Sequence, residues 1–273
     1  MKNKILLFLV LLCLGSMMNA QNIDVFYKLT MKPNVNDKNY VENDLFVLQI
    51  REKQSAFYSQ NYMKMMSDPA SLAKAKIDIN KISSNYIIAK EEGKLYHFLR
   101  IEEDMVKYED LNKPVWKLKK EYKTIDSMNC QQATTSFGGR DYVAWFSKDI
   151  PLPEGPYKFK NLPGLVVELY STDGDYHFVL EGLQESKEGL MLPKATLLKD
   201  RAQYLKEVKK FADNPSYKMQ MADGVNSDQF KYKTYKEGRE VSDNQKYKMI
   251  NQFVWDFMKV HNNPIEKDDI WIR

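Results

Sequence analysis

A glutamate and a histidine lie where the sequence predicts a tight hairpin. Asp173-Gly174 is typical of a two-residue type I′ turn between two apolar runs, 165–172 and 175–183. Counting outward from that turn makes Glu168 and His177 diagonal neighbours on one face of the hairpin. Such a pair could act as a general base or orient a ligand. A solvated polar face is the simpler interpretation, so we predict no catalytic residue and keep a hydrolase using His177 and Glu168 as an alternative.

Methionine is frequent in the chain, with 14 residues, and some of these residues cluster. The clusters are Met63, Met65 and Met66, then Met219 and Met221. Thioethers suit Cu(I), so a copper-responsive metal-binding protein is a second alternative. Methionine is also an adaptable packing residue, and core filling is the simpler interpretation. No spacing of His, Cys and Asp matches a zinc or iron site, so we predict no metal site and no cofactor.

A second hairpin is predicted around Gly138-Gly139, which joins the runs 130–137 and 140–147. Its register places aromatic residues on both faces. One face, carrying Tyr142 and Phe146 or Val143 and Trp145, is therefore expected to line a concave binding surface. The predicted ligand-binding residues of the two hairpins and the loop between them are Arg140, Tyr142, Trp145, Phe146, Tyr157, Tyr170 and His177.

The loop between the hairpins, 150–164, contains four prolines, so the sheet must break there. Pro163-Gly164 fits the central positions of a type II turn. Aromatic and apolar residues alternate with Lys158 and Lys160, and we expect the aromatic rings to lie under the sheet in an ordered loop. The residues assigned to this structural motif are Cys130, Gly138, Gly139, Gly155, Pro156, Phe159, Leu162, Pro163 and Gly164.

The stretch from Cys130 to Leu169 resembles the GLPGLI family of exported Bacteroidetes proteins. It contains C-x-x-A, GRDYVAWFSKDIP, GPYKF and FKNLPGLVVEL. In NLPGLV, residues 161–166, Asn161 and Val166 stand where the family hexapeptide has its first Gly and last Ile. Asn161 is expected to take a left-handed conformation in place of Gly. The resemblance implies export and a curved sheet similar to an accessory domain of some bacterial glycan-processing enzymes, but no established activity.

Residues 1–20 are typical of a cleaved signal peptide, with a basic start and an apolar run. Cys13 lacks the small preceding residue expected at a lipidation site, so we predict a periplasmic or secreted protein without a lipobox. Removing Lys2 and Lys4 with this peptide lowers the net charge from +4 to +2, too balanced to indicate nucleic acid. The mature chain retains one cysteine and no run long enough to cross a bilayer.

The remaining pattern predicts further strands and helices. Alternation predicts strands at 23–31, 45–51, 53–59, 86–89, 95–101, 106–108, 115–118 and 230–236. Helical spacing predicts helices within 62–78, 197–212 and 244–261.

Together these elements predict an α+β fold. Its strongly curved, bowl-like antiparallel sheet is a meander of hairpins, and the C-terminal helices cover the convex side. The expected divisions are a signal peptide at 1–20, a sheet core at 21–190 with a helical insertion near 62–78, and a helical extension at 191–273 packed on the same domain.

The function that this pattern favours is that of an exported, non-enzymatic binding or accessory protein. Its concave sheet face would hold a glycan, peptide or lipid-like ligand, or an envelope protein. We predict no nucleic-acid partner and no transmembrane segment in the mature chain.

Overall fold

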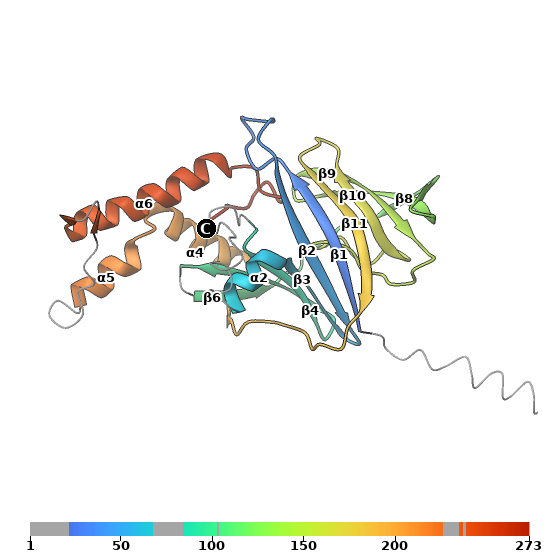
Figure 1. The fold of residues 1–273 in the computed structure, drawn as a ribbon, viewed down its shortest axis with the longest axis horizontal. Coiled ribbons are helices and arrows are strands. Elements are labelled where there is room, and N and C mark those ends of the chain that lie inside the picture. The colour runs from blue at the N-terminus through green and yellow to red at the C-terminus, as the bar shows by residue number, and fades with distance from the viewer. Residues whose placement is uncertain (1–21, 68–83, 103, 226–234, 237–238, 273) are drawn as a thin grey trace, which may run out of the picture.

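A computed structural model describes residues 22–67, 84–102, 104–225, 235–236 and 239–272 (Figure 1). The predicted signal peptide lies outside these residues, as does the predicted helical insertion beyond Ser67. The strands are β1 Ile23–Met31, β2 Glu42–Arg51, β3 Gln54–Ser59, β4 Tyr86–Glu91, β5 Lys94–Ile101, β6 Asp104–Glu109, β7 Lys117–Ile125, β8 Met128–Phe137, β9 Arg140–Ser147, β10 Leu165–Ser171, β11 Tyr176–Glu185, β12 Thr196–Leu197, β13 Tyr235–Lys236 and β14 Arg239–Glu240. The helices are α2 Gln60–Ser67, α4 Arg201–Asp213, α5 Tyr217–Val225 and α6 Asp243–Val260.

Twelve of the described strands form one open sheet, in the order β12-β6-β5-β4-β3-β2-β1-β11-β10-β9-β8-β7. All neighbours pair antiparallel except β12 and β6, which are parallel. The predicted antiparallel sheet is thus confirmed. Two runs of hairpins, β2–β6 and β7–β11, meet at β1, which pairs with β2 on one side and β11 on the other.

Both central hairpins have the predicted register. Gly138 and Gly139 have φ values of 57° and 78°, the positive values that a type I′ turn requires at both positions. Phe137 consequently pairs with Arg140, and Gln131 pairs with Phe146. In the second hairpin, Tyr170 pairs with His177 as predicted, but the turn is not type I′. Only Gly174 has a positive φ, and its amide donates to the Ser171 carbonyl at 2.9 Å.

The side chains of the strands alternate between two apolar layers, as the two-residue period of a strand dictates. In β2 and β3, Phe46 and Phe57 face the main core, whereas Val47 and Tyr58 face a second cluster. Helix α2 covers this second cluster with Tyr62. The sheet is therefore buried on both faces along these strands.

The proline-rich loop fills the concave side of the sheet. Phe159 packs on Tyr142 of β9 at 4.5 Å between ring centroids, while Tyr157 packs on Tyr86 of β4 at 5.4 Å. These strands lie on opposite arms of the sheet, with five other strands between them in the strand order. The sheet therefore curves around the loop.

The turn at the end of this loop differs from the predicted type II turn. The Gly164 amide donates to the Leu162 carbonyl at 2.8 Å, which closes a three-residue turn around Pro163. Asn161 has a φ of 69°, the left-handed conformation expected of it. Gly164 is required by space, because a Cβ there would lie 2.1 Å from the Ser147 carbonyl oxygen.

The C-terminal helices do not cover the convex side, contrary to the prediction. Tyr204 of α4 contacts His97 of β5 at 5.8 Å between ring centroids, and His97 also contacts Tyr157 at 6.3 Å. Helix α4 thus packs against the same face of β5 as the proline-rich loop. Figure 1 shows α4, α5 and α6 gathered at the side of the molecule away from β8, β9 and β10.

Helix boundaries follow local capping. Helix α4 begins at Arg201 rather than 197, because 196–197 forms β12 and the Asp200 carboxylate accepts from the Gln203 amide as N-cap. Ser242 and Gln245 form a capping box at the start of α6. Strand β7 extends to Ile125, further than predicted, while β13 forms a separate two-stranded sheet with β14. No described helix is long and apolar enough to cross a membrane.

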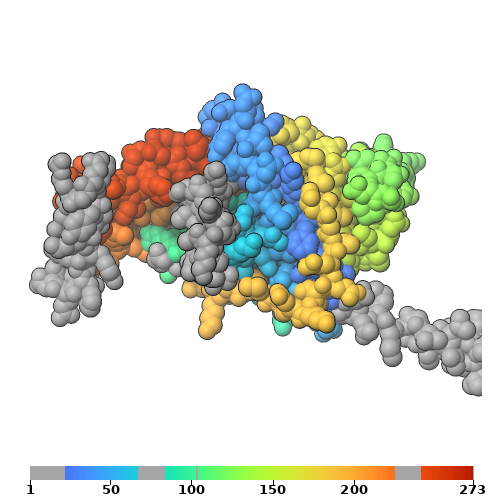
Figure 2. Space-filling model, in the orientation of Figure 1, coloured from blue at the N-terminus to red at the C-terminus, as the bar shows by residue number. Residues whose placement is uncertain are grey.

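The last described residues, 262–272, form a segment without helix or strand that turns at 266–269 and enters the concave side. The Tyr142 hydroxyl donates to the Ile265 carbonyl at 3.0 Å, and the Tyr176 hydroxyl donates to the Asn263 carbonyl at 2.6 Å. The predicted C-terminal extension is therefore helical only in part, and its end belongs to the sheet core. In Figure 2 the N-terminal strands lie beside the 165–185 hairpin, with α6 toward the opposite end from the 130–147 hairpin.

Candidate ligand-binding pocket

Four of the predicted ligand-binding residues lie in the core rather than at a concave surface. Tyr142, Phe146 and Tyr157 are buried under the loop and the C-terminal segment. Arg140 is also buried, and its guanidinium is paired with Asp173 at 2.5 Å and with other acceptors of the C-terminal segment and the 171–175 turn. The concave face expected from the sequence is filled by the chain itself.

The other three, Trp145, Tyr170 and His177, lie on the outer face of β9–β11. Glu168 joins them as predicted, since its Oε1 lies 2.9 Å from His177 Nε2. The Lys123 ammonium donates to Glu168 Oε2 at 2.5 Å and lies 4.5 Å above the centre of the Trp145 ring. Trp145 is buried beneath this lysine, so its indole face is covered.

The bonds around Glu168 limit its use as a base. Burial alone would raise the pKa of this carboxyl, but hydrogen bonds from Lys123 and His177 hold it below its ordinary value. A carboxylate stabilised in this way accepts a further proton less readily than a free one. The pair is therefore a polar contact on an outer sheet face.

The sulfur-containing residues lie in different environments. Met63 is buried against β3 and β5, with Met65 and Met66 packed beside it, whereas Met219 and Met221 are exposed on α5. Cys130 is buried in β8, and burial raises the pKa of its thiol. Within the residues described, no three His, Cys, Asp or Glu side chains come together as a metal site would require.

Buried lysines are a feature that the sequence did not predict. Lys158 is only 2% exposed, and its ammonium donates to Asp110 of the segment after β6 and to Glu266 of the C-terminal segment. Lys160 forms an ion pair with Glu154 at 2.8 Å. In the sequence, Lys158 and Lys160 alternate with aromatic residues, a pattern that predicts lysines facing outward. The acidic partners of Lys158 are too distant in the sequence for any local pattern to reveal the pairing.

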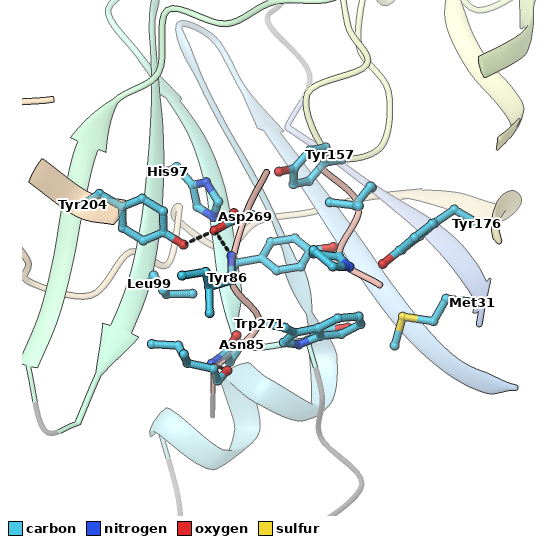
Figure 3. A pocket seen from close by; sticks show the side chains of 15 residues that line it. Met31, Asn85, Tyr86, His97, Leu99, Tyr157, Tyr176, Tyr204, Asp269 and Trp271 are labelled. Atoms are coloured by element: carbon cyan, nitrogen blue, oxygen red, sulfur yellow. Dashed lines mark hydrogen bonds between the residues drawn. The ribbon is translucent and has the colours of Figure 1, made fainter. Parts of the chain in front are cut away.

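A pocket opens between β4, β5, α4 and the C-terminal segment (Figure 3). The space inside it that a water-sized sphere can occupy is about 40 Å³, which is room for a few water molecules or a small end group. The walls are mainly aromatic, and among the described residues no lysine or arginine lines the pocket. The aromatic and polar lining residues are Tyr86, His97, Tyr157, Tyr176, Tyr204, Asp269 and Trp271.

His97 presents a free acceptor at this pocket. The Tyr108 hydroxyl donates to Asp110 Oδ2 at 3.2 Å, so it accepts the Nδ1–H of His97, which lies 3.0 Å away. Burial, with the charges of Lys158 and Arg201, lowers the pKa of His97 well below its ordinary value, so the ring is neutral. Its Nε2 then carries a lone pair, and this buried atom has no partner among the described residues.

Asp269 is the carboxylate of the pocket. Its Oδ1 accepts from the Tyr204 hydroxyl at 3.0 Å and from the Ile270 amide at 2.8 Å. Burial raises the pKa of Asp269 to about 6, so it is largely ionised at neutral pH. Figure 3 shows His97, Tyr204 and Asp269 together at one end of the pocket and Trp271 beyond them. Neither His97 nor Asp269 was singled out from the sequence, because each lies in an element without a motif.

Two crystal structures of PNGF-II, in space groups C2 and P21, are similar to this chain. Their TM-scores are 0.51 and 0.50 at 16% and 17% identity, and each alignment covers 70% of this chain. This chain spans about a third of PNGF-II, 33% and 34%. The likeness therefore shows a shared sheet fold.

A putative outer membrane lipoprotein-sorting protein domain from Vibrio parahaemolyticus also aligns, over 63% of this chain and 87% of its own. Its TM-score is 0.30 at 6% identity, too low to support an argument. No protein-family model matches the chain, and no curated protein matches its sequence.

Proposed function

We propose that this is an exported, non-enzymatic binding or accessory protein that takes a small ligand, or one end of a larger one, into the aromatic pocket. The observation that carries this proposal is the unpartnered His97 Nε2 in a pocket walled by aromatic rings. A buried acceptor without a partner is costly in a folded protein, and a ligand donor would offset that cost. The leader-like pattern of residues 1–20 supports export.

The pocket supports an end group as ligand rather than an extended chain. Most of the concave side is already occupied by the proline-rich loop and residues 262–272, so the space left is narrow. The ligand groups that we propose are a sugar, a peptide side chain or a lipid-like head group. Each would be carried by a molecule of the cell envelope. Aromatic walls with a few polar groups are typical of such sites.

A fragment screen by NMR tests the proposal. Ile270 lines the pocket and is only partly buried, so Ile270→Trp should fill the pocket and abolish binding of the fragments that bind the wild type. Leu197→Trp is the control, because Leu197 is 62% exposed on β12, away from the pocket lining. Fragments that bind the Ile270→Trp protein as well as the wild type would contradict the proposed site.

The non-enzymatic part needs a separate test. The purified protein should leave a panel of esters, peptides and glycosides intact. Hydrolysis that His177→Ala abolishes would instead establish the outer-face pair of His177 and Glu168 as catalytic, and the proposal would be wrong.

A further inference from the structure

We propose that the pocket selects an organic cation that carries N–H groups, namely a protonated primary or secondary amine on a short apolar body. This inference rests on the proposed function, because it names the ligand class of the same pocket. Three independent features of the pocket lead to it: its charge, its aromatic walls and the free acceptor of His97.

The charges around the pocket favour a cation. Among the described residues, the three basic side chains whose charges act on the pocket residues are each paired with two carboxylates. The pairs are Lys158 with Asp110 and Glu266, Arg140 with Asp173 and Asp175, and Arg201 with Asp268 and Glu266.

Asp269 is different from these paired carboxylates. Its hydrogen bonds come from neutral donors, the Tyr204 hydroxyl and the Ile270 amide. Arg201 acts on it only through its longer-range field, since its guanidinium is bonded to Asp268 at 2.8 Å. The carboxylate therefore leaves negative charge at the pocket that a ligand cation would neutralise.

The aromatic walls favour the same ligand. Five rings line the pocket, and the negative face of an aromatic ring attracts a cation most strongly where water is excluded. These rings belong to Tyr86, Tyr157, Tyr176, Tyr204 and Trp271. Three of the tyrosine hydroxyls already donate to protein acceptors, Glu266, Asn263 and Asp269, so they do not compete with the ligand as donors.

The acceptor at His97 requires that the cation keep an N–H. The Nδ1–H of His97 is donated to Tyr108, which leaves the Nε2 lone pair unpaired in the wall of the pocket. A protonated amine can donate to this lone pair and lie beside Asp269, whereas a quaternary ammonium has no hydrogen to donate. The combination distinguishes an amine from other cations.

A matched series of small ligands tests the inference. We would titrate n-butylammonium, 1-butanol, butyrate and tetramethylammonium, and follow the indole N–H signal of Trp271, identified by its loss in Trp271→Phe. We expect n-butylammonium to bind at least tenfold more tightly than each of the others. In Asp269→Asn its advantage over 1-butanol should disappear, while Asp256→Asn, which removes an exposed carboxylate of α6, should keep it.

The outcomes separate this inference from the proposed function. If 1-butanol binds as tightly as n-butylammonium, or if only other fragments bind, the cation proposal is wrong and the pocket remains a binding site. Tetramethylammonium binding as tightly as n-butylammonium would overturn the role of His97. If no fragment binds, both proposals fall. Should Asp269→Asn not fold, the series on the wild-type protein decides alone.

Discussion

The Tyr157 hydroxyl donates a hydrogen bond of 2.6 Å to Glu266 Oε1, which joins the proline-rich loop to the C-terminal segment across 109 residues of sequence. Both segments lie on the concave side of the sheet, and each buries the other. The interior of the bowl is thus a core, and the pocket is what remains open between the C-terminal segment and strands β4 and β5. The proposed binding pocket and the stability of the fold therefore depend on the same two segments.

Removing the Lys158 ammonium should destabilise the fold strongly. Lys158→Met would leave the Asp110 and Glu266 carboxylates buried without their cation. Removing one partner of a buried ion pair costs about 3–5 kcal/mol, because the other partner stays buried and charged. We expect a loss of this size in the free energy of unfolding measured with urea.

An exposed lysine supplies the control. Lys209 pairs with Asp213 on the surface of α4, so Lys209→Met should cost less than about 0.5 kcal/mol. Adding Glu266→Gln to Lys158→Met should recover part of the lost stability, because one unpaired charge is removed. Equal effects of the two lysine substitutions would show that Lys158 is not in a buried ion pair.

The turn at Gly164 should tolerate no side chain. A Cβ at this position would lie 2.1 Å from the Ser147 carbonyl oxygen, which is backbone and cannot move away alone. We expect Gly164→Ala to lower the free energy of unfolding by about 3 kcal/mol. Gly182→Ala is the control, because nothing lies within 4 Å of a Cβ there, and its stability should change by less than about 1 kcal/mol. A Gly164→Ala protein as stable as the wild type would mean that this close approach does not exist.

The sequence predicts those parts of the fold that short-range chemistry determines. Gly138-Gly139 forms the predicted two-residue turn, and counting from it gives every pair on both strands. The same count gives the pairs of the second hairpin, although its turn at Asp173-Gly174 is of another type. The contact between Glu168 and His177 follows from that count. The predicted part of the fold is therefore the hairpins.

The parts that the sequence did not reveal depend on contacts between distant segments. Alternation in the proline-rich loop places Tyr157 inward and Lys158 outward, yet both are buried, because Glu266 arrives from the far end of the chain. The same segment brings Asp269 beside Tyr204 and so creates the pocket. No local pattern marks residues 262–272 as core, since they contain neither strand alternation nor helical spacing.

Deleting residues 262–273 should open the concave side. The Tyr142 and Tyr176 hydroxyls would lose their carbonyl acceptors, and Lys158 would lose Glu266. Unsatisfied buried groups and exposed aromatic rings should give a loosened protein that binds a hydrophobic dye and unfolds at lower urea concentration. Deleting residues 1–21, which lie ahead of β1, is the control and should produce neither effect. A truncated protein with wild-type stability would show that the C-terminal segment does not belong to the core.

The charge of Asp269 should lower stability at neutral pH. Burial raises its pKa to about 6 from an ordinary value of 3.8, so the folded state binds this proton more tightly than the unfolded state does. Stability contributed by the protonated form is therefore lost as pH rises from about 4 to about 6, and the loss is complete above that range. Asp269→Asn keeps an oxygen to accept from Tyr204 and Ile270 but cannot ionise. We expect this variant to be more stable than the wild type by about 1–3 kcal/mol at neutral pH, with the difference shrinking toward about pH 4.

Urea unfolding at a series of pH values measures this difference, and comparing variant with wild type cancels other groups such as Asp44, whose pKa burial also raises to about 6. Asp256→Asn is the control with the opposite sign: hydrogen bonds from Lys259 and Gln252 lower the pKa of this exposed carboxyl, so its removal should be neutral or slightly destabilising as pH rises. A difference between Asp269→Asn and the wild type that does not change with pH would mean that Asp269 titrates as an ordinary carboxyl. The pocket would then lack the partly desolvated charge on which the proposed preference for a cation depends.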